Sequence, residues 1–320
     1  MRHIFIINPI SGKSDASQLL TPQIKTVMQA AKQPYQIIRT EAPGHAVELA
    51  RQCAEQQEPV RLYACGGDGT LNEVLCGAWR FENAEVACIP CGSGNDFVRN
   101  FDGVNLFSDL QAQLEGSAIS IDLMDVGEDR VAAVICSAGL DAQVAYGIPK
   151  FRRIPFCGGQ MAYHLSVVQQ VCGPLGHRLH VQTSEETFED EFLMAAICNG
   201  SCYGGGYQAS PKASLNDGLL DLVLVKKVSR LRIASVVGIY KNGKHIQNGE
   251  IRQDLRPIIQ LVRTREVSIT VRDDRPLILN IDGECGPGQQ LQARVLPGAA
   301  RFVLPKGAVM HNACPALIQA

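Results

Sequence analysis

A short glycine-rich stretch at residues 65–73 carries the residue types in this chain that are best suited to chemistry. It reads Cys-Gly-Gly-Asp-Gly-Thr-Leu-Asn-Glu, and it lies between a β-type run at 60–64 and Leu71, Val74 and Leu75 at helical spacing. Glycines without Cβ let several backbone N–H groups converge on one anion, and the following helix adds its positive dipole end. A strand-to-helix junction of this composition predicts phosphate binding.

Asp68 is the unusual member of this stretch. A carboxylate in a phosphate-binding loop repels its ligand unless a divalent cation or a bound water lies between them. The stretch therefore favours metal-assisted nucleotide chemistry. Thr70 and Glu73 also have the Thr-x-x-Glu spacing of a capping box, which would start a helix in any protein and does not compete with phosphate binding.

Two further loops place similar residues at the ends of predicted strands. Residues 8–12 read Asn-Pro-Ile-Ser-Gly, and residues 90–97 read Pro-Cys-Gly-Ser-Gly-Asn-Asp-Phe. Neither completes a common nucleotide motif, because Ile7 stands where a Walker A loop needs glycine and Phe97 replaces the third glycine of a dinucleotide fingerprint. An ordinary P-loop is therefore excluded, and NAD binding of the Rossmann type lacks support.

The elements that must position these loops alternate between strand-like and helix-like runs from residue 3 to about 124. Strands are predicted at 4–7, 36–40, 60–64 and 85–89, and helices at 19–32, at 46–56 and after the glycine loop. This βαβα order implies a parallel sheet with helices on both faces, and such sheets bind ligands at the carboxyl ends of their strands.

The second half of the chain has a different texture, with strand-like runs divided by turns. The strands are predicted at 130–136, 178–183, 192–199, 219–226, 266–271, 276–281 and 291–296, and helices at 154–171 and 229–241. This pattern predicts a mainly β second half, arranged as a sandwich.

Length and composition are consistent with two domains. The chain has 320 residues, of which 46% are hydrophobic, so it can bury a substantial core. Apolar runs are too short for a membrane span or a signal peptide, and we expect a soluble, cytosolic protein. The 12 cysteines lie mostly in apolar runs, which indicates reduced core thiols; a zinc site would require the 88/91 and 198/202 pairs to meet in space.

The net charge of −2 hides a basic segment at 226–265. Ten lysines and arginines face only two acidic residues there, so this segment carries +8 and the remainder −10. The segment is either an ordinary solvated face or a patch that meets an anionic surface, a membrane or a polyphosphate.

Four groups of motifs, taken in order, resemble the diacylglycerol kinase catalytic family, which includes sphingosine and ceramide kinases and soluble bacterial lipid kinases. They are Gly-Gly-Asp-Gly-Thr-x-Asn-Glu-Val at 66–74; Pro-x-Gly-Ser-Gly-Asn-Asp-Phe-x-Arg at 90–99; Asn-Gly at 199–200 with the glycines at 204–206, Pro-x-Ala at 211–213 and Asp-Gly-Leu-Leu-Asp at 217–221; and Ile-Asp-Gly-Glu at 281–284. NAD kinases and phosphofructokinases share Gly-Gly-Asp-Gly, but the ordered set covers nearly the whole chain.

The resemblance implies an α/β plus mainly β fold with the active site in the interdomain cleft. An N-terminal doubly wound α/β ATP-binding domain would span 1–124, with the tail of about 306–320 packing back on it. A C-terminal β-sandwich domain for the lipid substrate would span 125–305. The implied activity is ATP-dependent phosphorylation of a lipid hydroxyl, with diacylglycerol or a related lipid as the expected acceptor.

The resemblance also implies which residues serve the ligands. The ATP site would be lined by Asn8, Pro9, Ser11, Gly12, Thr40, Gly66, Gly67, Asp68, Gly69, Thr70, Asn72, Glu73, Ser93 and Gly94. Magnesium would be held by Asp68, Asp96 and Asp122, partly through water, and a second, structural magnesium by Asp217 with the backbone carbonyls of Ser214 and Leu219. Oxygen ligands of this kind suit a hard, six-coordinate cation.

Asp282 and Glu284 are the catalytic candidates. A carboxylate within hydrogen-bond reach of the attacking hydroxyl can accept its proton during phosphoryl transfer, while the other carboxylate binds metal or orients it. Asp-Gly is also a favoured hairpin dipeptide. The sequence does not decide which of the two is the base.

Two alternatives remain at this stage: an NAD kinase-like enzyme acting on a soluble nucleotide, and a non-catalytic regulator that binds nucleotide or lipid. For the lipid kinase we expect a lipid partner met at a membrane surface by peripheral contact, no nucleic-acid partner, and a cytoplasmic protein that associates with membranes transiently. A homodimer is left open.

Overall fold

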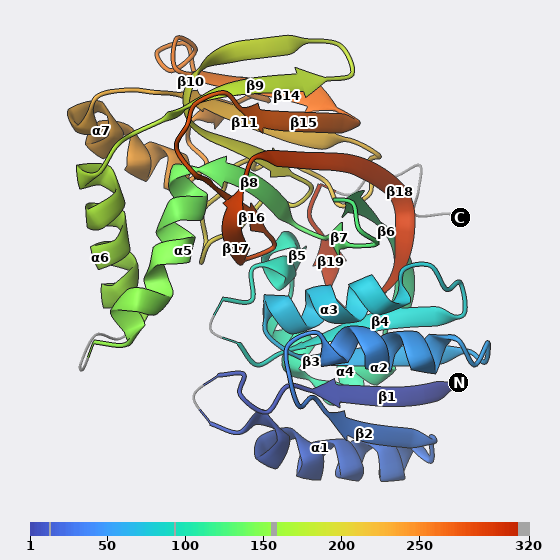
Figure 1. Cartoon of the computed structure of the whole chain (residues 1–320). Coiled ribbons are helices and arrows are strands. Elements are labelled where there is room, and N and C mark those ends of the chain that lie inside the picture. The colour runs from blue at the N-terminus through green and yellow to red at the C-terminus, as the bar shows by residue number, and fades with distance from the viewer. Residues whose placement is uncertain (13, 93, 155–158, 313–320) are drawn as a thin grey trace.

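A computed structural model describes residues 1–12, 14–92, 94–154 and 159–312 (Figure 1). The first half alternates strands and helices as expected. Its elements are β1 (Arg2–Ile7), α1 (Ala16–Ala31), β2 (Tyr35–Arg39), α2 (His45–Ala54), β3 (Val60–Gly66), α3 (Asp68–Ala78), β4 (Ala84–Pro90), η1 (Phe97–Asn100), β5 (Phe101–Asp102), η2 (Val104–Ser108), α4 (Leu110–Leu114) and β6 (Ser117–Asp125).

The strands β2, β1, β3 and β4 form a parallel sheet in that order, with helices on both faces. Side chains alternate along β1, so that Phe5 and Ile7 pack with Ile24 and Met28 of α1. Ile4 and its neighbours on the opposite face join the core that contains α2 and α3. Because the central strands are covered on both sides, β3 is buried along its whole length.

The second half is mainly antiparallel. Its elements are β7 (Val131–Ala132), β8 (Ile135–Gly139), α5 (Leu140–Arg152), α6 (Gly159–Cys172), β9 (His177–Thr183), β10 (Thr187–Cys198), β11 (Leu220–Lys226), α7 (Arg230–Lys241), β12 (Ile246–Gln247), β13 (Glu250–Ile251), β14 (Ile259–Thr264), β15 (Glu266–Val271), β16 (Leu277–Ile281), β17 (Glu284–Gly288), β18 (Gln290–Leu304) and β19 (Val309–Met310). Alternate residues of β8, β9, β10, β11 and β15 enclose a separate apolar core. The expected α/β plus β-sandwich architecture is confirmed.

One strand joins the two halves. β18 pairs with β15 near its start, with β6 along most of its length, and in parallel with β4 at Phe302 and Val86. Among the described residues, fifteen strands therefore belong to a single hydrogen-bonded sheet. Figure 1 shows β18 curving from the upper sandwich to the lower α/β layer. The proposed boundary at residue 124 stays a prediction.

The end of the chain returns to the first half. β19 pairs with β5 at Val309 and Met310, and His311 donates its backbone N–H to the Asn100 carbonyl at 2.9 Å. The expected tail at about 306–320 reaches beyond residue 312, and its last part lies outside the described residues.

One helix was not predicted, and one local prediction was wrong. The helix expected at 154–171 is α6, which the chain enters from α5, a helix that the sequence analysis did not predict. Thr70 and Glu73 do not form a capping box: α3 begins after Gly67, with no side-chain cap, and Glu73 Oε2 instead accepts the Ala46 N–H of α2 at 3.1 Å. Tertiary contact between α2 and α3 outcompetes the local cap.

Within the described part of the chain, no helix is both long and apolar enough to cross a lipid bilayer. The ten cysteines described there are free thiols. Most are buried in the cores, and among the described residues no group of three or more His, Cys, Asp or Glu side chains is placed to hold a metal ion. The zinc alternative gains no support.

Candidate active site

Three loops meet at the carboxyl ends of β1, β3 and β4. The Cys91 N–H donates to the Gly66 carbonyl at 2.7 Å, which joins the second loop to the third. A Cβ on Gly92 would lie 2.6 Å from the Gly67 Cα, and one on Gly12 would lie 2.6 Å from the Cys91 carbonyl oxygen. Only glycine permits backbones to approach this closely, so the loops form one compact backbone-lined surface.

The first turn of α3 faces this surface. Its N-terminal N–H groups have no side-chain cap, and the Thr70 hydroxyl accepts a hydrogen bond from Asn8 Nδ2 at 3.2 Å. Free N–H groups and the positive end of the helix dipole favour an anion such as a phosphate group.

Asp68 and Asp96 come together beside Gly94. The Asp68 carboxylate accepts the backbone N–H groups of Asp96 and Phe97 at 3.0 and 3.1 Å. Asp96 Oδ2 accepts the Gly205 N–H at 2.8 Å, while its Oδ1 is buried, has no hydrogen bond, and lies 3.4 Å from Arg99 Nε. Burial raises the pKa of Asp96, and the charge of Asp68 adds to this shift.

These two carboxylates fit a divalent cation. They are neighbouring negative charges, and one of their buried oxygens lacks a donor. Magnesium prefers one or two carboxylates and completes its shell with water and phosphate oxygens. The pair therefore has the chemistry of a magnesium site at the phosphate-binding loops.

A cavity of about 730 Å³ starts at these loops and continues into the second half of the chain. At one end it is lined by Ser11, Gly12, Gly67, Asp68, Gly69, Asn72, Gly92, Gly94 and Asp96. At the other end the lining is apolar and comes from α5, α6, α7 and neighbouring strands: Leu140, Val144, Ile148, Val167, Val171, Leu193, Met194, Val225, Ile233, Val236, Ile258 and Ile259. Asp282, Gly283 and Glu284 lie on the wall of the same cavity.

Both carboxylate oxygens of Asp282 accept hydrogen bonds from the protein. Its Oδ1 accepts the N–H groups of Val134 and Ile135 at 2.9 and 2.8 Å, and its Oδ2 accepts the Ala133 N–H at 2.5 Å and Asn72 Nδ2 at 3.1 Å. Burial raises its pKa, although these donors act in the opposite direction. Because Asn72 belongs to α3, Asp282 ties the glycine-loop helix to the second half of the chain.

Glu284 has a different environment. Its side chain is 55% exposed and pairs with Arg130, with 2.6 Å between Oε2 and Nη2. Its other oxygen has no recorded partner among the described residues. Glu284 therefore presents carboxylate to the cavity, whereas Asp282 holds the turn on which Glu284 sits.

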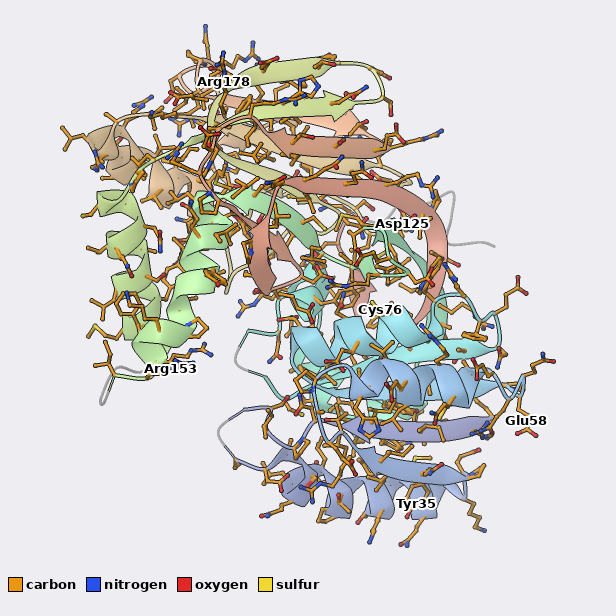
Figure 2. All side chains as sticks on the ribbon, in the orientation of Figure 1. Tyr35, Glu58, Cys76, Asp125, Arg153 and Arg178 are labelled. Carbon is orange, nitrogen blue, oxygen red and sulfur yellow. The ribbon has the colours of Figure 1, made fainter. Side chains whose placement is uncertain are left out.

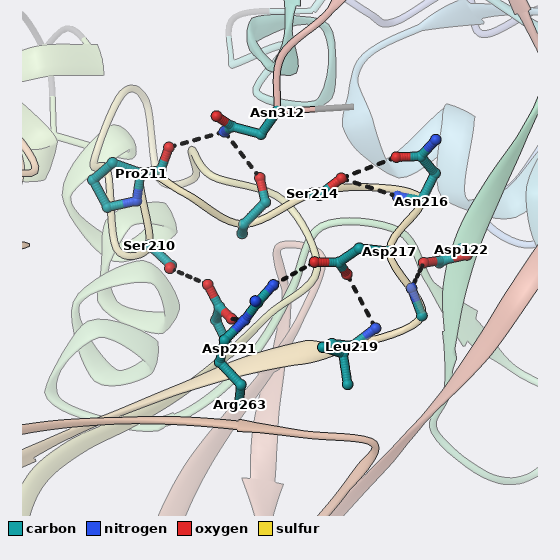
Figure 3. A network of polar contacts seen from close by, with 12 residues as sticks. Asp122, Ser210, Pro211, Ser214, Asn216, Asp217, Leu219, Asp221, Arg263 and Asn312 are labelled. Atoms are coloured by element: carbon teal, nitrogen blue, oxygen red, sulfur yellow. Dashed lines mark hydrogen bonds and ion pairs between the residues drawn. The ribbon is translucent and has the colours of Figure 1, made fainter. Parts of the chain in front are cut away.

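Asp122 does not line the cavity with Asp68 and Asp96. Its Oδ1 accepts the Gly298 N–H and its Oδ2 the Gly218 N–H, each at 2.7 Å, and the side chain is buried. It lies beside Asp217, whose charge adds to the burial that raises the Asp122 pKa (Figure 3). The structure thus places Asp122 with the loop expected to bind the second ion, away from the first.

The remaining predicted residues divide into two groups. The first group contacts other protein groups: Gly66 packs against the Thr70 side chain, Asn8 donates a hydrogen bond to the Thr70 hydroxyl, and Glu73 contacts α2. Pro9 and Thr40 are not among the lining residues, although both follow the strands β1 and β2 at the correct edge of the sheet. Ser93 lies outside the described residues.

The sequence analysis missed Asp141, in the first turn of α5 and on the cavity wall. Burial raises its pKa to about 6, and the Ser137 and Tyr203 hydroxyls offset part of the effect. Neither carboxylate oxygen has a hydrogen-bond partner of ordinary geometry among the described residues. The signal available in the sequence was an aspartate directly after the apolar run at 135–140. Its burial could not be predicted, because it depends on how α5 packs.

Comparisons with known proteins agree with this geometry. The family model described as the diacylglycerol kinase catalytic domain matches residues 2–126, and the one described as the YegS C-terminal NAD kinase beta sandwich-like domain matches residues 134–304. A probable lipid kinase YegS-like protein of Shewanella frigidimarina is 30% identical over 81% of this chain and 79% of its own length. A diacylglycerol kinase of Bacillus subtilis is 26% identical over 89% of this chain and 91% of its own length.

A solved structure has the same fold. The crystal structure of a putative diacylglycerol kinase from Bacillus anthracis superposes with a TM-score of 0.71, at 21% identity, over 94% of this chain and 96% of that one. Both halves of the chain thus share their fold with that structure.

Proposed function

The chain belongs to the diacylglycerol kinase family and is an ATP-dependent lipid kinase, and we propose that its acceptor is the hydroxyl group of diacylglycerol or a closely related lipid. The observation that carries this proposal is the single cavity, with phosphate-binding loops at one end and an apolar chamber at the other. A soluble nucleotide acceptor gives no reason for the apolar chamber.

The proposed division of labour follows the two family matches. Residues 1–124 would bind ATP through the three glycine-rich loops, and residues 125–305 would hold the lipid. Asp68 and Asp96 would hold magnesium, which would neutralise charge on the phosphates as they react.

We assign the role of general base to Glu284. It would accept the proton of the lipid hydroxyl as the hydroxyl oxygen attacks the γ-phosphorus and the bond to the ADP oxygen breaks. Asp282 is better placed to position the turn, since accepting a proton would disturb a carboxylate that already holds four donors. Arg130, paired with Glu284, would keep it oriented.

The lipid must be collected from a membrane, and we propose that the helices α5, α6 and α7 make this contact. Seven large apolar side chains are exposed on or beside them: Tyr146, Ile154, Met161, Leu165, Val168, Leu231 and Val237. Basic side chains lie on the same helices: Lys150, Arg152, Arg153, Arg230, Arg232 and Lys241. Figure 2 shows Arg153 at the end of α5, at the tip of the helical pair. Apolar side chains among cations are suited to an anionic bilayer surface.

This surface shares only α7 (Arg230–Lys241) with the basic segment at 226–265 considered above. Several cations of that segment are neutralised by local partners: Lys226 by Asp190, Lys227 by Glu191, Arg252 by Asp254, Arg256 by Glu250, and Arg263 by Asp217 and Asp221. The proposed membrane visits are peripheral and transient, from the cytoplasm. The proposal includes no nucleic-acid partner and no fixed oligomeric state.

The test is an unbiased acceptor assay. The purified protein is incubated with a total lipid extract, magnesium and γ-labelled ATP, and the labelled product is identified; a parallel reaction offers NAD. We expect label in a phosphorylated glycerolipid such as phosphatidic acid. Label in NAD alone, or transfer at background rates to every acceptor, would refute the proposal.

A further inference from the structure

Two acidic residues share one arginine where the loop between β10 and β11 ends: Asp217 in the loop and Asp221 in β11. Asp217 is the residue at which the family resemblance implied a structural magnesium ion, with the backbone carbonyls of Ser214 and Leu219. Figure 3 shows the Arg263 guanidinium between their carboxylates. Arg263 Nε donates to Asp221 Oδ1 at 3.1 Å, and its Nη2 donates to Asp217 Oδ2.

Strand register puts the arginine there. Asp221 of β11 and Arg263 of β14 are directly opposed in an antiparallel pair. Side chains of such a pair leave the sheet on the same face, at a distance that a long cation can span. The planar guanidinium has several donors in a fixed arrangement, so one arginine can serve two carboxylates at once, which an ammonium group does less well.

The other carboxylate oxygens are also satisfied. Asp217 Oδ1 accepts the Leu219 N–H at 3.1 Å, and Asp221 Oδ2 accepts the Ser210 hydroxyl. Both carboxylate oxygens of the nearby Asp122 accept hydrogen bonds, from the N–H groups of Gly218 and Gly298. Magnesium requires oxygen lone pairs directed at it from several sides. Arg263 already holds Asp217 Oδ2 and Asp221 Oδ1 through hydrogen bonds, whereas Arg99 makes no hydrogen bond to the free Oδ1 of Asp96. The residues present therefore do not fit the ion that the resemblance implies.

Burial explains why a cation is needed at all. The Asp217 and Asp221 side chains are 16% and 5% exposed, so two neighbouring carboxylates are largely withdrawn from water. Burial raises the pKa of Asp221, and the charge of Asp217 adds to this shift. The Arg263 side chain is 51% exposed and reaches the pair from the surface. Burial alone would lower the pKa of Arg263, but the two carboxylates raise it.

We propose that Arg263 is the permanent counter-cation of this loop and replaces the structural magnesium ion, so that the loop folds without divalent metal. The same loop carries Gly205, whose N–H reaches Asp96 at the phosphate-binding end of the cavity. Arg263 thereby stabilises a loop that spans from the second half of the chain to the nucleotide loops. This inference is independent of which lipid is phosphorylated.

The test measures metal content and thermal stability in the absence of nucleotide. The full-length protein is gel-filtered in metal-free buffer, its magnesium is measured by mass spectrometry, and its Tm is compared with and without EDTA. We expect no stoichiometric magnesium and no change of Tm with EDTA. One retained ion per chain, or a fall in Tm with EDTA, overturns the proposal without depending on any variant.

Variants then test the arginine directly. In EDTA, Arg263→Gln should lower Tm by about 2–4 °C, because two buried carboxylates lose their cation. Added magnesium should restore part of this loss in Arg263→Gln but not in the double variant Arg263→Gln/Asp217→Asn. The matched control is Arg294→Gln, which removes another surface arginine from an ion pair, with Asp125. A Tm for Arg263→Gln that equals the control's and does not respond to magnesium overturns the proposal.

Discussion

At the scale of single residues, the two carboxylates of the Asp-Gly-Glu turn lie in different surroundings. Asp282 is surrounded by donors from Asn72 and from residues 133–135, whereas Glu284 is half exposed and meets one arginine. A residue that holds backbone and a residue that exchanges a proton should respond differently to an isosteric change.

This difference gives a paired prediction. Glu284→Gln should lower kcat by about 10²–10⁴-fold with Tm and ATP affinity unchanged, since it removes only a proton acceptor. Asp282→Asn should lose activity and also stability, by about 1–3 kcal/mol, because an amide NH2 would face backbone N–H groups. Steady-state kinetics, calorimetric measurement of ATP binding and Tm distinguish the two variants. Glu250→Gln is the control, as another exposed glutamate paired with an arginine. An active Glu284→Gln enzyme contradicts the assignment.

Asp141 predicts a pH effect of known sign. Its folded pKa of about 6 lies above the ordinary value of 3.8, so the native state binds more protons than the unfolded state between about pH 4 and 6. Stability should therefore fall as pH rises through this window. Asp141→Asn should remove that loss. Its free energy of unfolding should exceed that of wild type by an amount that grows between pH 4 and pH 6 and reaches on the order of 2 kcal/mol.

The control for Asp141 has the opposite sign. Despite some burial, the Arg178 N–H and His177 hold the pKa of Asp273 at about 2. As pH rises from about 2 to 4, wild type gains stability because Asp273 loses its proton more readily in the folded state. Asp273→Asn lacks this gain and should be less stable than wild type above about pH 4. Denaturant titrations across pH 2–8 measure both differences. A pH-independent difference between Asp141→Asn and wild type would show that Asp141 is not the buried acid described here.

At the scale of elements, the helices α5, α6 and α7 do two things. Their inward side chains line the apolar chamber, and their outward side chains leave large apolar groups in solvent. α5 and α6 pack against each other as a pair beside the sandwich (Figure 1). This arrangement supports the proposal that the same helices receive an acyl chain inside and touch the bilayer outside.

The outward face should be needed for membranes and not for chemistry. Leu231 is 85% and Val168 59% exposed, and replacing both with serine should weaken binding to anionic vesicles by about 10-fold or more. Turnover of a short-chain, monomerically dissolved diacylglycerol should stay unchanged. Vesicle flotation and kinetics measure the two properties. Leu19→Ser on α1, equally exposed at 58%, is the control; an equal loss there, or none in the double variant, would argue against this surface.

At the scale of the whole molecule, β18 makes two family-matched regions into one hydrogen-bonded body. Near its end, Phe302 pairs with Val86 of the α/β sheet and packs against Phe97 and Phe101, with ring centroids 4.8 and 5.6 Å apart. The start of the same strand lies in the sandwich beside β15. We therefore expect both halves to unfold together.

Two substitutions test this coupling. Phe302→Ala in the α/β core and Phe192→Ala in the sandwich core should each cost about 3–5 kcal/mol and lower the same single calorimetric transition. If the halves are independent, the wild type would show two transitions, and each variant would shift only one of them.

The sequence by itself determined the fold class, the family and the chemistry of the loops. Strand and helix periodicity is local, and Gly12 and Gly92 are informative because a Cβ on either would lie 2.6 Å from the backbone of a neighbouring loop. Asp68, Asp96, Asp282 and Glu284 could be proposed as site residues because motif residues carry their chemistry in their type and order.

Only the tertiary structure decided what those carboxylates meet. It brought Asn72 to Asp282, separated Asp122 from Asp68 and Asp96, and set Arg263 between Asp217 and Asp221. It also buried Asp141, and it replaced the expected cap of α3 with a contact to α2. The role of a charged group depends on its partners and its distance from water, and folding brings both from residues far away in the chain.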